Sequence, residues 1–275
     1  MPNVLKREKQ IAVIAALAEG MAIRQIERMT EIHRDTIMRL GVRVGQGCAR
    51  IMDAKMRDLN CQNIQVDELW GFIAKKKRNL TPDDDATKGD AWTFCAIDAD
   101  SKLVPAYKVG KRDVATATAF MADLSSRLKN RVQLSTDGLR AYADAVELAF
   151  GADVDYGQIV KTYAAVETKA PQRRYSPPEL VNITKNSIMG DPDDALISTS
   201  YVERLNLTTR HHMKRLARLT IAFSKKLENF EAAVGLHFAY YNFVKTHRAI
   251  RCTPAQAANV EQSAWTVADL VEMTT

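Results

Sequence analysis

The sequence predicts an α/β protein in which a mixed β-sheet with flanking helices follows an all-helical segment. Residues 1–60 show helical periodicity, and from about residue 62 β-rich runs alternate with helices. The 275 residues, 46% hydrophobic and 26% charged, suffice for one large domain plus a small one, or for two. We expect a domain at 1–60, a core at 61–225 with an irregular insertion at about 164–199, and C-terminal helices at 226–275 that pack on the core.

The first sixty residues predict three helices. The first helix is expected to end at Glu19-Gly20, and a short second helix has apolar residues at a spacing of three. In the third helix, Ile37 and Leu40 are expected to face inward, and Arg34 and Arg39 outward. This arrangement favours a DNA-binding helix-turn-helix, and residues 1–59 hold eleven Lys/Arg against seven Asp/Glu. A three-helix packing or dimerisation module is the alternative.

The remainder of the chain gives an ordered series of strands and helices. Three antiparallel strands are expected at about 64–76, 91–99 and 103–111, followed by a helix (114–128), a strand (131–138), a helix (141–150) and a strand (156–163). This order is that of a ribonuclease-H-like core. Helices are expected at 200–219 and 227–247, and a short one begins at Thr253-Pro254.

Three acidic residues lie where this strand order would bring them together. Asp67 is inside the first strand, Asp137 follows the fourth strand, and Glu203 begins the helix after the insertion. Such oxygen ligands can hold two Mg²⁺ ions about 3.5–4 Å apart, an arrangement that supports phosphodiester displacement.

Each acidic residue also has a purely structural interpretation. Asp67 can pair on its strand, with Glu68 on the opposite face as the ligand instead. Asp137-Gly138 is a common turn dipeptide. Ser200 and Glu203 match a helix capping box, in which the glutamate bonds back to the backbone.

Basic residues follow Glu203 on its helix. At 100° per residue, Arg210 and Lys214 lie near the Glu203 face, and residues 204–226 hold seven Lys/Arg and no Asp or Glu. We expect both side chains to contact DNA phosphates, although a basic run can be only a solvated face. His212 is expected to pack and not to bind metal. The net charge of +6 also favours a polyanionic partner.

Several motifs resemble bacterial insertion-sequence transposases of the DDE type, with the insertion-sequence-one family as the best match. The resemblance covers roughly residues 60–260 and is specific through the combination of its motifs. These are Asp67-Glu-Leu-Trp70, Ser135-Thr-Asp-Gly138, Tyr175-Ser-Pro-Pro178, Thr199-Ser-Tyr-Val-Glu-Arg-Leu-Asn-Leu-Thr208, Ala222-Phe-Ser-Lys-Lys226, Tyr240-Tyr-Asn-Phe-Val-Lys-Thr-His-Arg248 and Thr253-Pro-Ala255.

The resemblance implies a DNA transposase that cuts the ends of its element and joins them to target DNA. Asp67, Asp137 and Glu203 would be the catalytic metal-binding triad for two Mg²⁺ or Mn²⁺ ions, supported by Asn206. The partners would be double-stranded element ends and target DNA, with at least a homodimer on DNA. Some family members carry an N-terminal cysteine zinc motif, which this sequence lacks, so recognition of the ends would rest on the helix-turn-helix.

Two alternatives use the same scaffold: a non-catalytic DNA-binding regulator and a structure-selective ribonuclease-H-like nuclease.

The four cysteines form no C-x-x-C pair, and no apolar stretch approaches the ~20 residues of a membrane span. We therefore expect a cytoplasmic protein without membrane contact, associated with the nucleoid when bound to DNA.

Overall fold

The centre of the protein is a six-stranded mixed sheet, seen in a computed structural model that describes residues 5–164, 179–217 and 219–274. The strands lie in the order β3-β2-β1-β4-β5-β6. Their bounds are β1 Asn63–Ile73, β2 Gly89–Asp98, β3 Tyr107–Gly110, β4 Val132–Thr136, β5 Val154–Tyr163 and β6 Leu180–Met189. The first three strands are antiparallel neighbours, and β4 pairs parallel with both β1 and β5. This order confirms the ribonuclease-H-like prediction.

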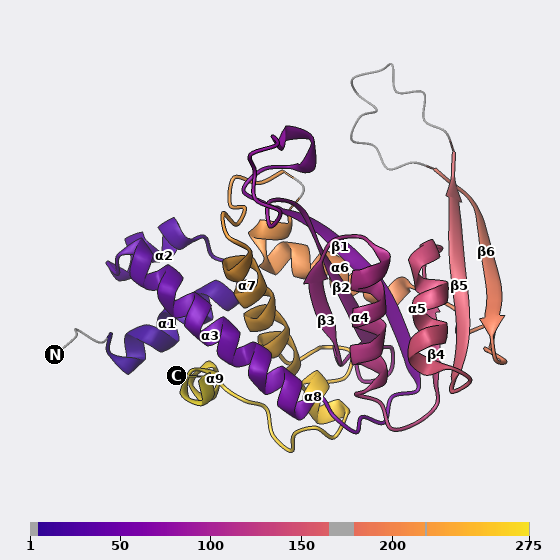
Figure 1. The fold of residues 1–275 in the computed structure, drawn as a ribbon. Helices are drawn as coiled ribbons and strands as arrows, with labels where there is room; N and C mark the ends of the chain where they lie inside the picture. The colour runs from indigo at the N-terminus through magenta and orange to yellow at the C-terminus, as the bar shows by residue number, and fades with distance from the viewer. Residues whose placement is uncertain (1–4, 165–178, 218, 275) are drawn as a thin grey trace.

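One face of the sheet is covered by α4 (Val114–Ser125) and α5 (Arg140–Phe150) (Figure 1). The Phe94 ring of β2 points to these helices and contacts the Phe120 and Tyr142 rings at centroid distances of 5.9 and 6.2 Å. Helix α4 begins at Asp113, whose side chain accepts a hydrogen bond from the Thr116 amide and so satisfies one free N–H of the first turn.

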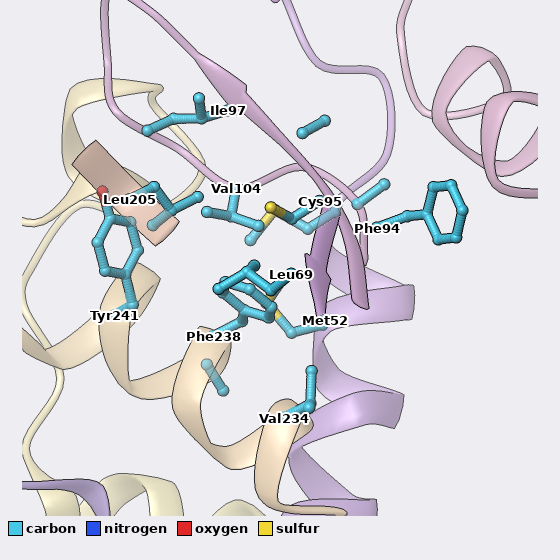
Figure 2. Close-up of a cluster of buried hydrophobic side chains, with 14 of the residues drawn as sticks. Met52, Leu69, Phe94, Cys95, Ile97, Val104, Leu205, Val234, Phe238 and Tyr241 are labelled. Atoms are coloured by element: carbon cyan, nitrogen blue, oxygen red, sulfur yellow. The ribbon is translucent and has the colours of Figure 1, made fainter. Parts of the chain in front are cut away.

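The opposite face packs against α6 (Ser200–His212) and α7 (Leu227–Ala239), which continues into a π-helical turn, Tyr240–Val244. Figure 2 shows this core, in which Leu69 and Cys95 of the sheet meet Leu205 of α6 and Phe238 of α7. Successive residues of a strand point to opposite faces. Phe94 and Cys95 therefore reach two different helical layers.

The N-terminal helices are α1 (Arg7–Ala18), α2 (Ile23–Thr30) and α3 (Arg34–Lys55). The predicted end of the first helix is confirmed: α1 stops at Ala18, and Gly20 adopts a positive φ of 84°. Ile37 and Leu40 are buried, whereas Arg34 and Arg39 are exposed, as expected.

Helix α3 spans 22 residues and runs beside α7 (Figure 1). The two helices approach closely at Gly45 and Gly235. A Cβ atom on Gly45 would lie 2.0 Å from the Ala232 carbonyl oxygen, so no larger residue fits at this crossing. Val44, Cys48 and Met52 of α3 belong to the same apolar core as the sheet.

The C-terminal residues form α8 (Pro254–Ala257) and α9 (Val267–Thr274). Thr253 is the N-cap of α8 and accepts a hydrogen bond from the Gln256 amide, which confirms the expected helix start. Helix α9 was not foreseen and lies against α1 and α3. Among the residues that the structure describes, no helix is both long and apolar enough to cross a bilayer.

Three expectations for individual elements are corrected. Residues 180–189, expected to be irregular, form β6 and pair antiparallel with β5. The helix that begins at Ser200 ends at His212 because Met213 is extended, so Lys214 lies in a separate 3₁₀ turn, Lys214–Leu216. The α-helix that begins at Leu227 ends at Ala239, before the expected end at residue 247, and continues as the π-helical turn. The motif at 175–178 lies outside the described residues.

Candidate active site

Three carboxylates meet at the end of the pairing between β1 and β4. Asp67 and Glu68 belong to β1, and Asp137 directly follows β4. One oxygen from each side chain lies within 4.8 Å of the others. The parallel pairing of these strands stops at Gln65 and Ser135. Beyond that point the edge of β1 that faces β4 is no longer paired with it. We attribute to this gap the approach of both Asp67 and Glu68, whose side chains leave opposite faces of the strand, to Asp137.

Asp67 is held on the side of the sheet that faces α6. Its Oδ2 atom accepts a hydrogen bond of 2.7 Å from the Asn206 side-chain amide, and its Oδ1 atom accepts one of 2.8 Å from the Glu68 backbone N–H. Burial raises the pKa of Asp67 to about 7, and the nearby Glu68, Asp137 and Glu203 carboxylates act in the same direction. The surroundings of Asp67 therefore disfavour its negatively charged form.

Glu68 points toward α5 and is more enclosed. Its side chain is only 2% exposed. Its Oε2 atom accepts a 2.8 Å hydrogen bond from the Tyr142 hydroxyl, and its Oε1 atom accepts one of 2.5 Å from Arg112 Nε. Burial raises the pKa of Glu68, whereas Tyr142 and Arg112 oppose the rise. Both oxygens of this carboxylate thus already have donors within the protein.

Asp137 is the most open of the three, with 39% of its side chain exposed. Its Oδ1 atom accepts a 2.9 Å hydrogen bond from the Leu139 amide, which is the contact expected of an aspartate that begins a turn. Its Oδ2 atom lies 3.9 Å from Arg112 Nη2. Asp137 therefore both begins a turn and belongs to the acidic cluster.

Glu203 lines the same cleft as Asp67 but lies outside the three-residue cluster. Its carboxylate forms an ion pair with Lys161 of β5 and accepts a 2.7 Å hydrogen bond from the Thr199 hydroxyl. The capping-box interpretation is wrong, because the Ser200 amide donates to Ser198 Oγ and Thr199 precedes the helix as its N-cap. Glu203 is 48% exposed and is not tied to the backbone of the helix start.

The cleft has a volume of about 800 Å³. Its walls come from β1, β2 and α6, and the lining residues are Asp67, Glu68, Trp70, Trp92, Glu203, Asn206, Leu207 and Arg210. Arg210 thus lies beside Glu203 as expected, although its guanidinium also donates to the Leu216 carbonyl oxygen at 2.6 Å.

Lys214 is not an extension of the face that carries Arg210, since the helix ends before it. Its ammonium lies 3.4 Å from the Gln25 side-chain oxygen of α2. His212 is partly buried between Glu19 and Lys245, which agrees with a packing role. Arg34 and Arg39 lie on the exposed side of α3, and the acidic cleft does not include them.

The donors of the acidic cluster fit a hard divalent cation. All of the candidate ligand atoms are carboxylate oxygens, which Mg²⁺ and Mn²⁺ prefer over nitrogen or sulfur. Asp67 is mostly buried beside other acidic groups, and a cation would relieve their repulsion. The acidic cluster is therefore a candidate site for such a cation.

Sequence reasoning missed Arg112, Tyr142 and Lys161, each of which bonds a carboxylate of this cleft. Arg112 and Lys161 come from segments far from the acidic residues in the chain, and Tyr142 belongs to the apolar face of α5. Their pairing depends on the packed sheet, and no local motif signals it. Asn206 was named only through the family resemblance, and it does contact Asp67.

Comparison with known proteins gives matches of one kind. The family model described as "IS1 transposase" matches residues 192–244. The InsB protein of insertion element IS1 2 from Escherichia coli (strain K12) is 25% identical over 171 residues, which are 62% of this chain and 70% of the relative. The IS1 InsB protein of Shigella sonnei shows the same identity over 62% of this chain and 89% of its own length.

Solved structures give weaker matches. A piggyBac transposase synaptic complex with hairpin DNA aligns with a TM-score of 0.44 at 8% identity, over 96% of this chain and 70% of that one. A Mos1 transposase paired-end complex aligns with a TM-score of 0.22 at 16% identity, over 54% of this chain and 58% of that one. These scores are too low to support the fold, which rests on the strand order itself.

The strand order, the acidic cleft and the sequence matches together define a DDE-type DNA transposase. Within that class the chain is similar to the IS1 insertion-element transposases.

Proposed function

We propose that this transposase cleaves the ends of its insertion sequence and joins the freed 3′-hydroxyl groups to target DNA, with Asp67, Asp137 and Glu203 as metal ligands. The observation that supports this most is the approach of acidic side chains from β1, from the end of β4 and from α6 to one region of the structure. The class implies a divalent metal, and we propose two Mg²⁺ or Mn²⁺ ions.

Two such ions would activate the attacking oxygen and stabilise the leaving oxygen. The protein's own contribution is to hold the ligands in place. Asn206 fixes one oxygen of Asp67, and the Leu139 amide fixes one oxygen of Asp137. Arg210, which lines the cleft beside Glu203, is placed to contact a phosphate of the bound strand.

We assign Asp67, rather than Glu68, to the triad. Glu68 has donors on both of its oxygens and is almost fully buried, so a metal would have to displace Arg112 or Tyr142 to reach it. Asp67 also has a donor on each oxygen, but both donors are neutral amides, so a cation would not have to displace an arginine. In this proposal Glu68 keeps Arg112 beside Asp137.

The proposed partner is double-stranded DNA. Helices α2 and α3 would read the element ends through Arg34 and Arg39, and Arg210 and Lys214 would bind phosphates. Both ends must be handled together, so we propose at least a dimer on DNA. The protein would act in the cytoplasm, on the nucleoid.

The test is a cleavage and joining assay with purified protein and the terminal sequences of the DNA that flanks the gene. Wild-type protein should nick and join these ends only when Mg²⁺ or Mn²⁺ is present. Asp137→Asn should abolish both steps and leave end binding almost intact, because the substitution removes a charge needed only for the metal. Full activity of Asp137→Asn would end the assignment.

The same assay separates the two other functions for this scaffold. Specific end binding without any metal-dependent nicking would indicate a regulator. Cleavage without joining would indicate a nuclease.

A further inference from the structure

Two tryptophans lie beside the acidic cleft without a part in the proposed chemistry. Trp70 of β1 and Trp92 of β2 are direct cross-strand partners. They share a sheet face with Glu68 and Phe94, by the alternation of side chains along a strand. Both are partly exposed and line the same cleft as the carboxylates.

A second hollow of about 500 Å³ adjoins this cleft and shares Trp70 with it. Its other lining residues are Lys76, Lys77, Arg78 and Asp90. The Lys76 ammonium lies 5.5 Å from the centre of the Trp70 ring, and Arg112 lies 5.0 Å from the centre of the Trp92 ring. Cations therefore reach both rings, and one acidic side chain accompanies the three basic residues of the second hollow.

We propose that Trp70 and Trp92 form a stacking platform for an unpaired nucleobase of the DNA strand whose phosphate occupies the acidic cleft, with Lys76, Lys77 and Arg78 binding the adjacent phosphates. This inference rests on the proposed function. Aromatic faces combined with a positive groove are the features by which proteins hold single-stranded nucleic acid without reading its sequence.

The distance along the strand sets the position of that base. Trp70 is three residues beyond Asp67, which is about 10 Å along a β-strand. The same length corresponds to about three base steps of B-DNA. The unpaired base therefore lies within about three nucleotides of the reacting phosphate.

The experiment measures DNA binding by the full-length protein without divalent metal, so that it is independent of catalysis. The probes are a fluorescent 30-base-pair duplex, the same duplex with a five-nucleotide unpaired tail, and a tailed duplex whose tail is abasic. Wild-type protein should prefer the base-containing tail over the abasic tail by about ten-fold, within the range of base–aromatic stacking.

Trp70→Ala should remove most of this preference, and Trp70→Phe should retain most of it. Trp265→Phe is the control, because Trp265 stacks on Phe243 and lines neither hollow. The double variant Lys77→Gln and Arg78→Gln should weaken binding of every probe and reduce its salt dependence.

Equal binding of base-containing and abasic tails by wild-type protein would overturn the platform, as would an unchanged preference in Trp70→Ala. Absence of joining together with an intact preference would contradict the proposed function and leave the platform standing. Joining by wild-type protein without a preference for the base-containing tail would support the proposed function and overturn the platform.

Discussion

Among the acidic residues of the cleft, Glu203 has a basic partner of its own. Lys161 approaches it from β5, whereas Glu68 and Asp137 share Arg112. Glu203 is half-buried and does not form the predicted capping box, although its carboxylate accepts a hydrogen bond from the hydroxyl of the N-cap residue Thr199. We propose that Glu203 lies in the cleft as a metal ligand.

Glu203→Gln tests this interpretation. Glutamine keeps the shape and the hydrogen bond from Thr199 but loses the negative charge that holds a divalent cation. We expect DNA joining to fall by orders of magnitude, with the melting temperature and DNA binding close to wild type. The readouts are a joining assay, thermal unfolding and a binding titration on the same preparation. Joining near the wild-type rate would refute the role of Glu203 as a ligand.

The residue-level prediction from sequence was incomplete for a physical reason. Asp67, Asp137 and Glu203 could be singled out because the strand order brings their positions together. The sequence could not show that Glu68 shares the cluster, since alternation places it on the opposite face from Asp67. Only the end of the β1–β4 pairing, which depends on the packed sheet, allows both carboxylates to approach Asp137.

At the level of elements, the third helix joins two regions. Its N-terminal end carries the exposed Arg34 and Arg39, while Val44, Cys48 and Met52 are buried in the core that includes the sheet. The DNA-reading role proposed for the N-terminal end is therefore best tested in the full chain, where the C-terminal part of the helix stays buried.

Replacing both Arg34 and Arg39 by alanine should reduce the preference for element ends over random DNA by roughly ten-fold or more. A good base contact contributes about 1–3 kcal/mol of discrimination. Competition binding with the two DNAs measures this ratio. Arg7→Ala is the control, because Arg7 is an exposed arginine of α1 paired with Glu272. Equal weakening for both DNAs would show that the two arginines bind only phosphate.

The crossing of α3 and α7 gives a second prediction at this scale. Gly45→Ala should lower the free energy of unfolding by about 1–3 kcal/mol, because the new methyl group meets the Ala232 backbone. Urea denaturation measures the change.

Gly41→Ala on the same helix is the control for Gly45→Ala. Its nearest neighbour is the movable Leu17 Cδ1 atom at 3.1 Å. Alanine favours the helix by about 0.5–1 kcal/mol, so this variant should be at least as stable as wild type. Wild-type stability of Gly45→Ala would contradict the close packing of the two helices.

The elements that the sequence predicted well are those with a buried face. Strands β1, β2, β4 and β5 carry apolar residues that pack into the core, and these residues stood out in the sequence. Strand β6 is exposed along nearly its whole length and pairs with one neighbour only. Its apolar residues, among them Leu180, Val181 and Ile183, do not alternate regularly with polar ones, so no strand pattern stood out. Helix α6 ends early, and Met213 and Leu216 after it are buried in the core. Placing residues at 100° per residue assumes a continuous helix, so it could not show this end.

For the molecule as a whole, one apolar core connects the helices proposed to read DNA with the cleft proposed to carry out the chemistry. The N-terminal helices, α7 and the sheet share that core, and the acidic cleft opens where β1 leaves β4. We propose that the carboxylates at this opening hold the metal required for DNA joining.

Asp137→Cys, assayed for DNA joining in Mg²⁺ and in Mn²⁺, tests whether Asp137 binds this metal. A thiolate is a poor ligand for Mg²⁺ and a better one for Mn²⁺, and the substitution leaves the other ligands in place. We expect joining to be lost in Mg²⁺ and partly restored in Mn²⁺, while wild-type protein is active in both. Joining by Asp137→Cys in Mg²⁺ at the wild-type rate would contradict a metal-binding role for Asp137.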